Sequence, residues 1–201
     1  MKPAQRRIGL YGGSFDPVHN AHLALARLAR DHLGLDELRL VPVRQQPQKA
    51  RRMAPAADRV AMLRLAIEGE PRLRIEDCEL HREGPSYTVD TVRELQARAD
   101  GQGAEWFMVI GQDQYAGLHT WHAWHELLGL VTLAVAGRAG EEPRPGAQLA
   151  AVPHRIVTLP LPAMALSASD VRGRVARGEG IAEMVPPAVA SYIERTHLYR
   201  S

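Results

Sequence analysis

The stretch "IGLYGGSFDPVHNAH", residues 8–22, decides the fold. Its apolar start, residues 8–11, predicts a strand, and residues 20–33 have the apolar spacing of a helix, which Gly34 ends. A strand, a glycine turn and a helix are typical of a phosphate site, because N–H groups at a helix start attract anions. The stretch has neither G-x-G-x-x-G nor G-x-x-x-x-G-K-[ST], and it offers two histidines instead.

The two histidines, His19 and His22, lie three residues apart at the helix entry, so they can face one ligand. Imidazoles there can donate hydrogen bonds to phosphate oxygens and carry positive charge when protonated. The alternative is one capping and one packing histidine. We expect Gly12 and Gly13 to let the backbone approach a ligand and to permit positive φ.

Strands and helices alternate along the rest of the chain. Strands are predicted at residues 37–43, 73–80, 104–111, 130–138 and 154–161, and helices at 57–68, 85–99, 167–178 and 186–196. The runs at 104–111 and 130–138 are almost wholly apolar, as expected of strands buried on both faces of a parallel sheet. This alternation predicts an α/β fold with a mainly parallel sheet.

Composition excludes several classes of protein. The formal net charge of +2 gives no general nucleic-acid signature, and no apolar stretch reaches transmembrane length. We therefore expect a cytoplasmic protein with no membrane or nucleic-acid partner. The single cysteine, Cys78, excludes an internal disulfide and is expected to be buried and inert.

A second motif, "LSASDVR" at residues 166–172, lies near the C-terminal end. Ser167 and Asp170 fit a helix capping box, with Arg172 on the surface. Alternatively, a helix N-terminus with the hydroxyls of Ser167 and Ser169 and the guanidinium of Arg172 forms a triphosphate clamp. Ligands bind at the carboxyl ends of parallel strands, so we expect this motif, residues 12–22, 44–49 and 111–124 to converge on one crevice.

Both motifs resemble the signatures of the nucleotidylyltransferase superfamily, G-[TS]-F-D-P-x-H-x-G-H and I-S-S-T-x-I-R. Ala21 stands at a usual glycine, and Ala168 stands at the middle serine. "PSYTVDTV" (85–92), "IGQDQYAGLHTWHAWHEL" (110–127) and "VPPAVASYIERTHLY" (185–199) resemble segments of bacterial nicotinate-nucleotide adenylyltransferases. The resemblance spans nearly the whole chain. It implies a Rossmann-like, doubly wound sheet with helices on both faces, in one domain over residues 1–201 whose residues 163–201 form a small closing helical part.

The resemblance also implies a reaction and its site. ATP and nicotinate mononucleotide would give deamido-NAD and pyrophosphate, with Mg²⁺ arriving on ATP and no metal site in the protein. The implied catalytic residues are His22, His19 and Arg172. The implied ATP site comprises Gly12, Gly13, Ser14, Phe15, His19, His22, Asp113, Ser167, Ser169 and Arg172. The implied nicotinate mononucleotide site comprises Ser14, Lys49, Tyr87, Thr88 and Trp121.

Simpler interpretations stay open for individual residues. Trp121 offers a face to the cationic pyridine ring, with Trp124 expected to be structural, yet either tryptophan could be core. Asp113 could cap a turn, and Lys49 could be a solvated loop residue. Two or three of the histidines of "HTWHAWH", His119, His122 and His125, are expected to be solvated, rather than all three to be zinc ligands.

Two other functions also remain open. One is a nucleotidylyltransferase that uses nicotinamide mononucleotide or another phosphate acceptor. The other is a nucleotide-sensing module that binds ATP without releasing pyrophosphate. The sequence leaves the oligomeric state open, including a homo-oligomer.

Overall fold

The structure, a computed structural model, describes residues 5–44, 53–137 and 141–200. The opening stretch forms β1 (Arg7–Gly13) and α1 (Asn20–His32), as predicted. Gly34 follows α1 at φ +57°, and its N–H donates to the Asp31 carbonyl. Glycine adopts this left-handed conformation without a Cβ clash, so the predicted helix end is confirmed.

Six parallel strands form one sheet in the order β3-β2-β1-β4-β5-β6. The remaining strands are β2 (Glu37–Pro42), β3 (Leu73–Ile75), β4 (Glu105–Gly111), β5 (Thr132–Ala136) and β6 (Ile156–Leu159). The order reverses between β1 and β4, which are neighbours with Leu10 opposite Met108. The predicted doubly wound α/β fold is confirmed. Its switch point, where ligands bind in such sheets, lies where β1 and β4 end.

The helices that cover the sheet follow the predicted alternation, with several shorter elements added. They are α2 (Ala56–Ala66), α3 (Cys78–His81), α4 (Thr88–Ala97), α5 (Gln112–Ala116), the 3-10 helix η1 (Leu118–Thr120), α6 (Trp124–Leu130), α7 (Ala147–Ala150), α8 (Ala168–Ala176) and α9 (Pro187–Thr196). All these helices of the described residues are too short or too polar to cross a bilayer.

Side chains along the central strands alternate between two hydrophobic clusters, one on each face of the sheet. On β4, Phe107 and Val109 join the cluster that contains residues of α1, α2 and α9. Met108 and Ile110 join the opposite cluster, with residues of α4 and α6. Both faces of the sheet are therefore covered, which explains the uninterrupted apolar sequence of β4.

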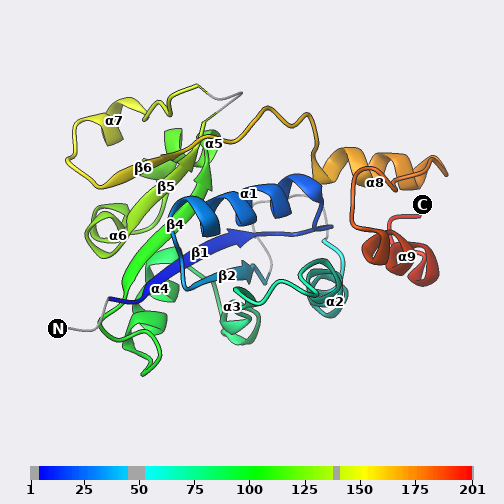
Figure 1. Ribbon diagram of the computed structural model, residues 1–201, viewed down its shortest axis with the longest axis horizontal. Coiled ribbons are helices and arrows are strands. Elements are labelled where there is room, and N and C mark those ends of the chain that lie inside the picture. Colours follow the sequence, from blue (N-terminus) through cyan, green and yellow to red (C-terminus); the bar gives the residue numbers. More distant parts are fainter. Residues whose placement is uncertain (1–4, 45–52, 138–140, 201) are drawn as a thin grey trace.

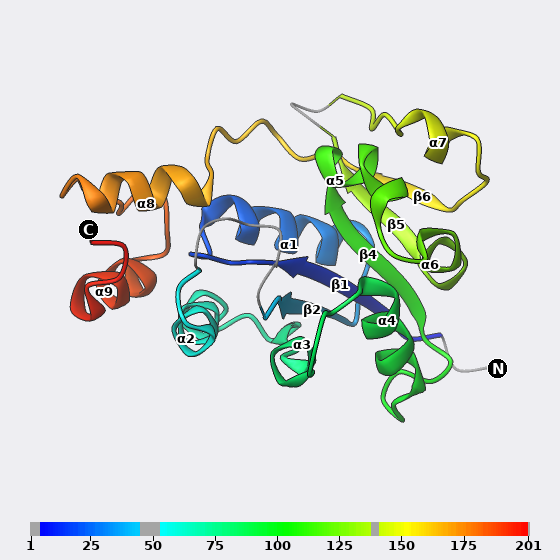
Figure 2. The same ribbon diagram turned by 180° about the vertical axis from the view of Figure 1, so that it is seen from behind.

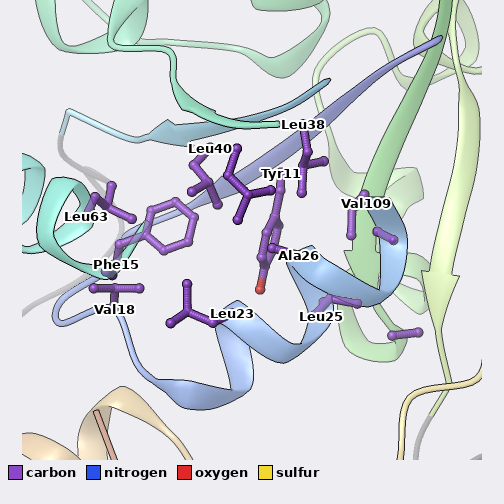
Figure 3. Packing of buried hydrophobic residues seen from close by; sticks show 14 of the residues in the cluster. Tyr11, Phe15, Val18, Leu23, Leu25, Ala26, Leu38, Leu40, Leu63 and Val109 are labelled. Carbon is purple, nitrogen blue, oxygen red and sulfur yellow. The ribbon is translucent and has the colours of Figure 1, made fainter. Parts of the chain in front are cut away.

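The turn after β1 is anchored in the first of these clusters. Phe15 is fully buried with Val18, Leu40 and Leu63 in this cluster (Figure 3). Its backbone has φ 45°, in the left-handed region that non-glycine residues rarely adopt. A Cβ on Gly13 would meet the Phe15 ring at 3.0 Å. Gly13 therefore makes room for a core side chain inside the turn.

The predicted C-terminal helical part, residues 163–201, holds α8 and α9. Both helices lie beyond the carboxyl end of β1, reached from β6 by an extended segment (Figures 1 and 2). The Tyr192 hydroxyl of α9 donates to Asp58 Oδ1 of α2 at 2.7 Å. This part of the chain thus extends the molecule at the edge of the sheet where ligands are expected.

The predicted strand at 73–80 is too long. The strand ends at Ile75, and Cys78–His81 forms α3 instead. The polar pair Glu76 and Asp77 separates the two elements, and the Glu76 carboxylate accepts the Cys78 N–H at 3.3 Å. Cys78 is buried as predicted, and burial raises the pKa of its thiol to about 12.

Candidate active site

The two histidines of the first turn form a stacked pair. The rings of His19 and His22 have centroids 3.6 Å apart and planes 21° apart. Phe15 meets the His22 ring edge to face at 5.1 Å, which fixes the pair against the core. Both imidazoles therefore lie together at the start of α1, as the sequence predicts.

Hydrogen bonding defines the proton positions on this pair. His22 Nδ1 accepts the backbone N–H of His19 at 3.2 Å, so a neutral His22 carries its proton on Nε2. His19 is 5% exposed, and its Nδ1 is buried without a hydrogen-bond partner among the described residues. A buried polar atom without a partner is costly, and a ligand at this site would remove that cost.

Charge on the pair is disfavoured in the ligand-free protein. Burial lowers the pKa of His19 to about 4, which the charge of Asp170 partly opposes. Burial, followed by repulsion from His19, lowers the pKa of His22 to about 3. Both rings are therefore neutral near pH 7, so the structure favours the hydrogen-bond donor role over the cationic one.

The glycines of the turn differ from expectation. Neither Gly12 nor Gly13 has positive φ; Phe15 takes that conformation instead. A Cβ on Gly12 would meet no atom of the described residues within 4 Å, so Gly12 borders open space as a ligand contact requires. The Phe15 side chain is core, which leaves only its backbone for a nucleotide. Ser14 is half-buried, and its carbonyl is held by Arg59 at 2.8 Å.

The second motif lies against the first, although 156 residues separate Arg172 from Asp16. Arg172 Nη1 donates to the Asp16 carbonyl at 2.6 Å. Asp170 is near enough to His19 for each to shift the pKa of the other. The backbone and side-chain amides of Asn20 donate to the carbonyls of Met184 and Glu183, both at 2.9 Å. The two motifs therefore lie side by side, as the convergence argument predicts for this pair of segments.

The polar groups of the second motif already bond to one another. The Ser167 hydroxyl donates to Asp170 Oδ2 at 2.6 Å and accepts the Asp170 N–H at 3.2 Å, which confirms the capping box. Arg172 Nη2 donates to the Ser169 hydroxyl at 2.9 Å. Ser167 and Ser169 are exposed, so phosphate oxygens can reach both hydroxyls and replace their present partners, Asp170 and Arg172.

Asp113 lies where β4 ends, beside the end of β1. It is exposed, in the first turn of α5, which Gly111 caps. It lines a cleft of about 270 Å³ with Gln112, Glu141, Glu142 and Arg144. Gln112 Nε2 donates to the Arg144 carbonyl at 2.7 Å, and Gln112 Oε1 accepts the Arg144 backbone N–H at 2.9 Å. Asp113 therefore faces a hollow at the switch point.

The residues expected to hold nicotinate mononucleotide lie on two adjoining loops. The rings of Tyr87 and His122 stack at 4.2 Å, which joins the start of α4 to the segment between η1 and α6. Thr88 is the first residue of α4, where backbone N–H groups have no partner within the helix. Trp121 and Trp124 are both half-buried against the same cluster, so burial does not separate their roles.

Tyr87 is the cap residue of α4, and no side chain among the described residues caps the start of this helix. The Ser86 hydroxyl is instead buried without a partner in the described structure, and sequence reasoning missed it as a possible ligand contact. The three histidines of "HTWHAWH" are not on one helix, because His119 belongs to η1, His122 to the linker and His125 to α6. Within the described ranges, no group of three or more His, Cys, Asp or Glu side chains could hold a metal ion.

Sequence reasoning also missed a buried junction under the first turn, made by Asp16, Arg59 and Tyr199. Arg59 is 1% exposed, and within the described residues its hydrogen bonds go only to backbone carbonyls, so no residue pattern signals it. The Tyr199 hydroxyl donates to Asp16 Oδ1 at 2.7 Å. Lys49 lies outside the described residues.

Comparisons with known proteins agree with this geometry. Residues 10–174 match the cytidylyltransferase-like family model. A probable nicotinate-nucleotide adenylyltransferase of Methylibium petroleiphilum is 51% identical over 199 residues, covering 97% of this chain and 93% of that protein. A protein of the same name from Bordetella petrii is 48% identical, covering 97% and 100%.

Solved structures share the fold. Plasmodium falciparum nicotinic acid mononucleotide adenylyltransferase complexed with NaAD superposes with a TM-score of 0.79 at 18% identity, covering 97% of this chain and 98% of that one. The same enzyme complexed with APC gives a TM-score of 0.74. With nearly full-length relatives at about half identity, this chain belongs to the nicotinate-nucleotide adenylyltransferase family, within the cytidylyltransferase-like proteins.

Proposed function

We propose that this protein transfers the adenylyl group of ATP to nicotinate mononucleotide, giving deamido-NAD and pyrophosphate in NAD biosynthesis. The observation that carries the proposal is the stacked, neutral His19–His22 pair at the switch point, with the first turn of α8 held against it. The names of the relatives and the NaAD bound to the Plasmodium falciparum enzyme support the same activity.

The chemistry requires no nucleophile from the protein. A phosphate oxygen of nicotinate mononucleotide attacks the α-phosphorus of ATP, a new P–O bond forms, and the bond to pyrophosphate breaks. Such transfers depend on alignment and on stabilising charge in the transition state. His22 donates Nε2–H to the α-phosphate, where negative charge builds up, and His19 helps to hold the triphosphate.

The first turn of α8 holds the leaving group. Ser167, Ser169 and Arg172 bind the β- and γ-phosphates, exchanging the bonds that they make in the ligand-free protein. Gly12, Gly13, Ser14, the Phe15 backbone and Asp113 complete the ATP site. Mg²⁺ enters on ATP, held mostly by phosphate oxygens and water.

The acceptor lies against Tyr87, Thr88 and Trp121, with Ser14 toward its phosphate, and Lys49 is proposed from the sequence to neutralise that phosphate. The Trp121 ring stacks on the cationic pyridine, and the N–H groups at the start of α4 receive the carboxylate. Acid and amide have similar shapes, so this charge preference is what separates nicotinate from nicotinamide mononucleotide. A cytoplasmic location and the absence of nucleic-acid and membrane partners stay predictions, and the oligomeric state stays open.

Pyrophosphate release tests the proposal. Purified protein is assayed with ATP and Mg²⁺, with nicotinate and nicotinamide mononucleotide side by side. Faster turnover of the acid is expected. Comparable rates would make the enzyme dual-specific, and binding of ATP without release from either acceptor would indicate the sensing module.

The two tryptophans provide a matched pair of variants. Trp121→Ala should raise KM for nicotinate mononucleotide about tenfold, as loss of a cation–π contact predicts. Trp124→Ala, which removes the other half-buried indole, should lower Tm and leave that KM within about twofold. If Trp124→Ala raised this KM more than Trp121→Ala did, Trp124 would be the stacking residue and Trp121 the structural one.

A further inference from the structure

A buried arginine organises the backbone beneath the phosphate site. Among the described residues, Arg59 of α2 is the largest of the nearly fully buried side chains, and it donates to four backbone carbonyls. Nη1 bonds Ser14 at 2.8 Å, Nη2 bonds Val43 at 2.8 Å and Arg44 at 3.1 Å, and Nε bonds Ala54 at 3.1 Å. One rigid guanidinium thus links the turn after β1, the end of β2 and the segment before α2.

Asp16 joins the same junction from the turn itself. It is 1% exposed, and its Oδ1 accepts the Ala54 N–H at 3.2 Å and the Tyr199 hydroxyl at 2.7 Å. Its charge attracts Arg59, which offsets the burial of that guanidinium. The Asp16 carbonyl accepts a hydrogen bond from Nη1 of Arg172, in α8, at 2.6 Å. Residues 14–16 are therefore held from α2, α8 and the segment after α9.

The held segment lies immediately before the histidines. Ser14 and Asp16 are five and three residues before His19, and Phe15 between them is in the left-handed conformation. Such a conformation persists only where surrounding contacts impose it, and Arg59 and Arg172 bond the carbonyls on either side of Phe15. The His22 ring depends on the same turn, through the His19 N–H and the edge of Phe15.

We propose that Arg59 is a positioning residue for adenylyl transfer, acting through the turn of residues 14–16 to place His19 and His22. The proposal rests on the proposed function for its kinetic readout. Arg59 has no room to touch substrate, because it is buried and all of its hydrogen bonds in the described structure go to main-chain carbonyls. Its effect on the reaction must therefore pass through the turn.

Arg59→Lys is the test variant, because lysine keeps the charge but lacks the planar fork that reaches four carbonyls. Arg39→Lys is the matched control. Arg39 is 4% exposed and pairs with Glu37 at 2.5 Å and with Asp100 at 2.7 Å, in the amino half of β2. Both variants are assayed at a temperature where circular dichroism shows each to be folded.

We expect Arg59→Lys to lower kcat about tenfold to a hundredfold, with a smaller change in KM for ATP, because small misplacements of aligned groups act on the transition state. Arg39→Lys should keep kcat within about twofold while also lowering Tm. Equal kcat values in two folded variants would overturn the proposal, since loss of stability alone would then account for both.

A spectroscopic measurement separates this proposal from the proposed function. In protein with ¹⁵N-labelled histidine, His22 Nδ1 should have the shift of a hydrogen-bonded acceptor in the wild type and in Arg39→Lys, but an altered shift in Arg59→Lys. An unaltered shift in Arg59→Lys would overturn the positioning role. Absence of pyrophosphate release from the wild type would overturn only the proposed function.

If Arg59→Lys does not fold, Tyr199→Phe decides, because it removes one hydroxyl from the same junction. It should lower kcat about threefold to tenfold, as expected for loss of one hydrogen bond to a charged group. A folded Tyr199→Phe protein with wild-type kcat and an unaltered His22 shift would overturn the proposal.

Discussion

The two ends of the sheet use buried arginines in opposite ways. At the amino end, Arg39 meets the carboxylates of Glu37, Glu76 and Asp100. At the carboxyl end, Arg59 meets backbone carbonyls from three chain segments. At the amino end the arginine is paired with side-chain carboxylates. At the carboxyl end the arginine donates to backbone carbonyls and so holds the main chain in place. The same residue type therefore stabilises the fold at one end and shapes the site at the other.

The surrounding groups follow the same division. Glu37 is 3% exposed and forms ion pairs with Arg6, Arg39 and Arg74. The charges of this network are therefore balanced by one another. The carboxyl end gathers neutral imidazoles, hydroxyls and helix N-termini, which favour an added anion. These hydrogen-bond donors, rather than net charge, indicate that the carboxyl end is the one that takes the triphosphate.

The largest expected effect on stability is at the amino end. Arg39→Met should lower the free energy of unfolding by about 3 kcal/mol, the low end for breaking a buried pair, because Glu37 keeps Arg6 and Arg74. Urea unfolding measures this change. Turnover of the folded fraction should stay at the wild-type value. A loss of kcat in the folded fraction would show that Arg39 also affects the site, against the contrast between the two ends.

At the carboxyl end, His22→Asn removes the Nε2–H donor of His22 while keeping an acceptor for the His19 N–H. The Asn oxygen can replace Nδ1 as acceptor for the His19 N–H, but nothing replaces Nε2–H. We expect kcat to fall about a hundredfold to a thousandfold, as for loss of one transition-state donor, with little change in KM for ATP. Steady-state kinetics checks this, and near-normal turnover would remove His22 from the catalytic role.

Acid should weaken the carboxyl end selectively. His19 and His22 have folded-state pKa values of about 4 and 3, below the ordinary 6.5, so the unfolded chain binds more protons as the pH falls below 6.5. Stability is therefore fully present above about pH 6.5 and declines toward pH 4, by about 1–2 kcal/mol for each ring at pH 5. Unfolding of the wild type at pH 7 and pH 5 measures this decline.

The double variant His19→Gln/His22→Asn is the control, because neither replacement titrates in that range. Its stability should change less between pH 7 and pH 5 than that of the wild type. An equal decline in both proteins would assign the pH dependence to other groups.

The smallest effect tests the cap of α8. Ser167→Ala should lower stability by about 1 kcal/mol, since the hydroxyl caps the helix through Asp170. If Ser167 also binds phosphate, KM for ATP should rise severalfold. Ser167→Asn separates the two roles, because asparagine is an equally good cap without the hydroxyl. An unchanged KM in both variants would leave Ser167 a structural cap only.

Local features were predictable from the sequence, and distant ones were not. The strand, turn and helix around His19 and the Ser167–Asp170 cap depend on neighbouring residues, and the structure confirms them. The short α3 was missed because its four residues, Cys78–His81, are too few to show a helical period. Arg59 was missed because its acceptors are carbonyls, which every residue carries.

The contact between Tyr199 and Asp16 spans 183 residues, which has a consequence for synthesis in the cell. At ribosomal speeds of about 5–20 residues per second, Asp16 is made roughly ten to forty seconds before its tyrosine. Throughout that interval the nascent chain must keep the first turn without this bond. A translation product halted before residue 199 would contain both histidines and most of the sheet, yet it would lack this bond to the first turn.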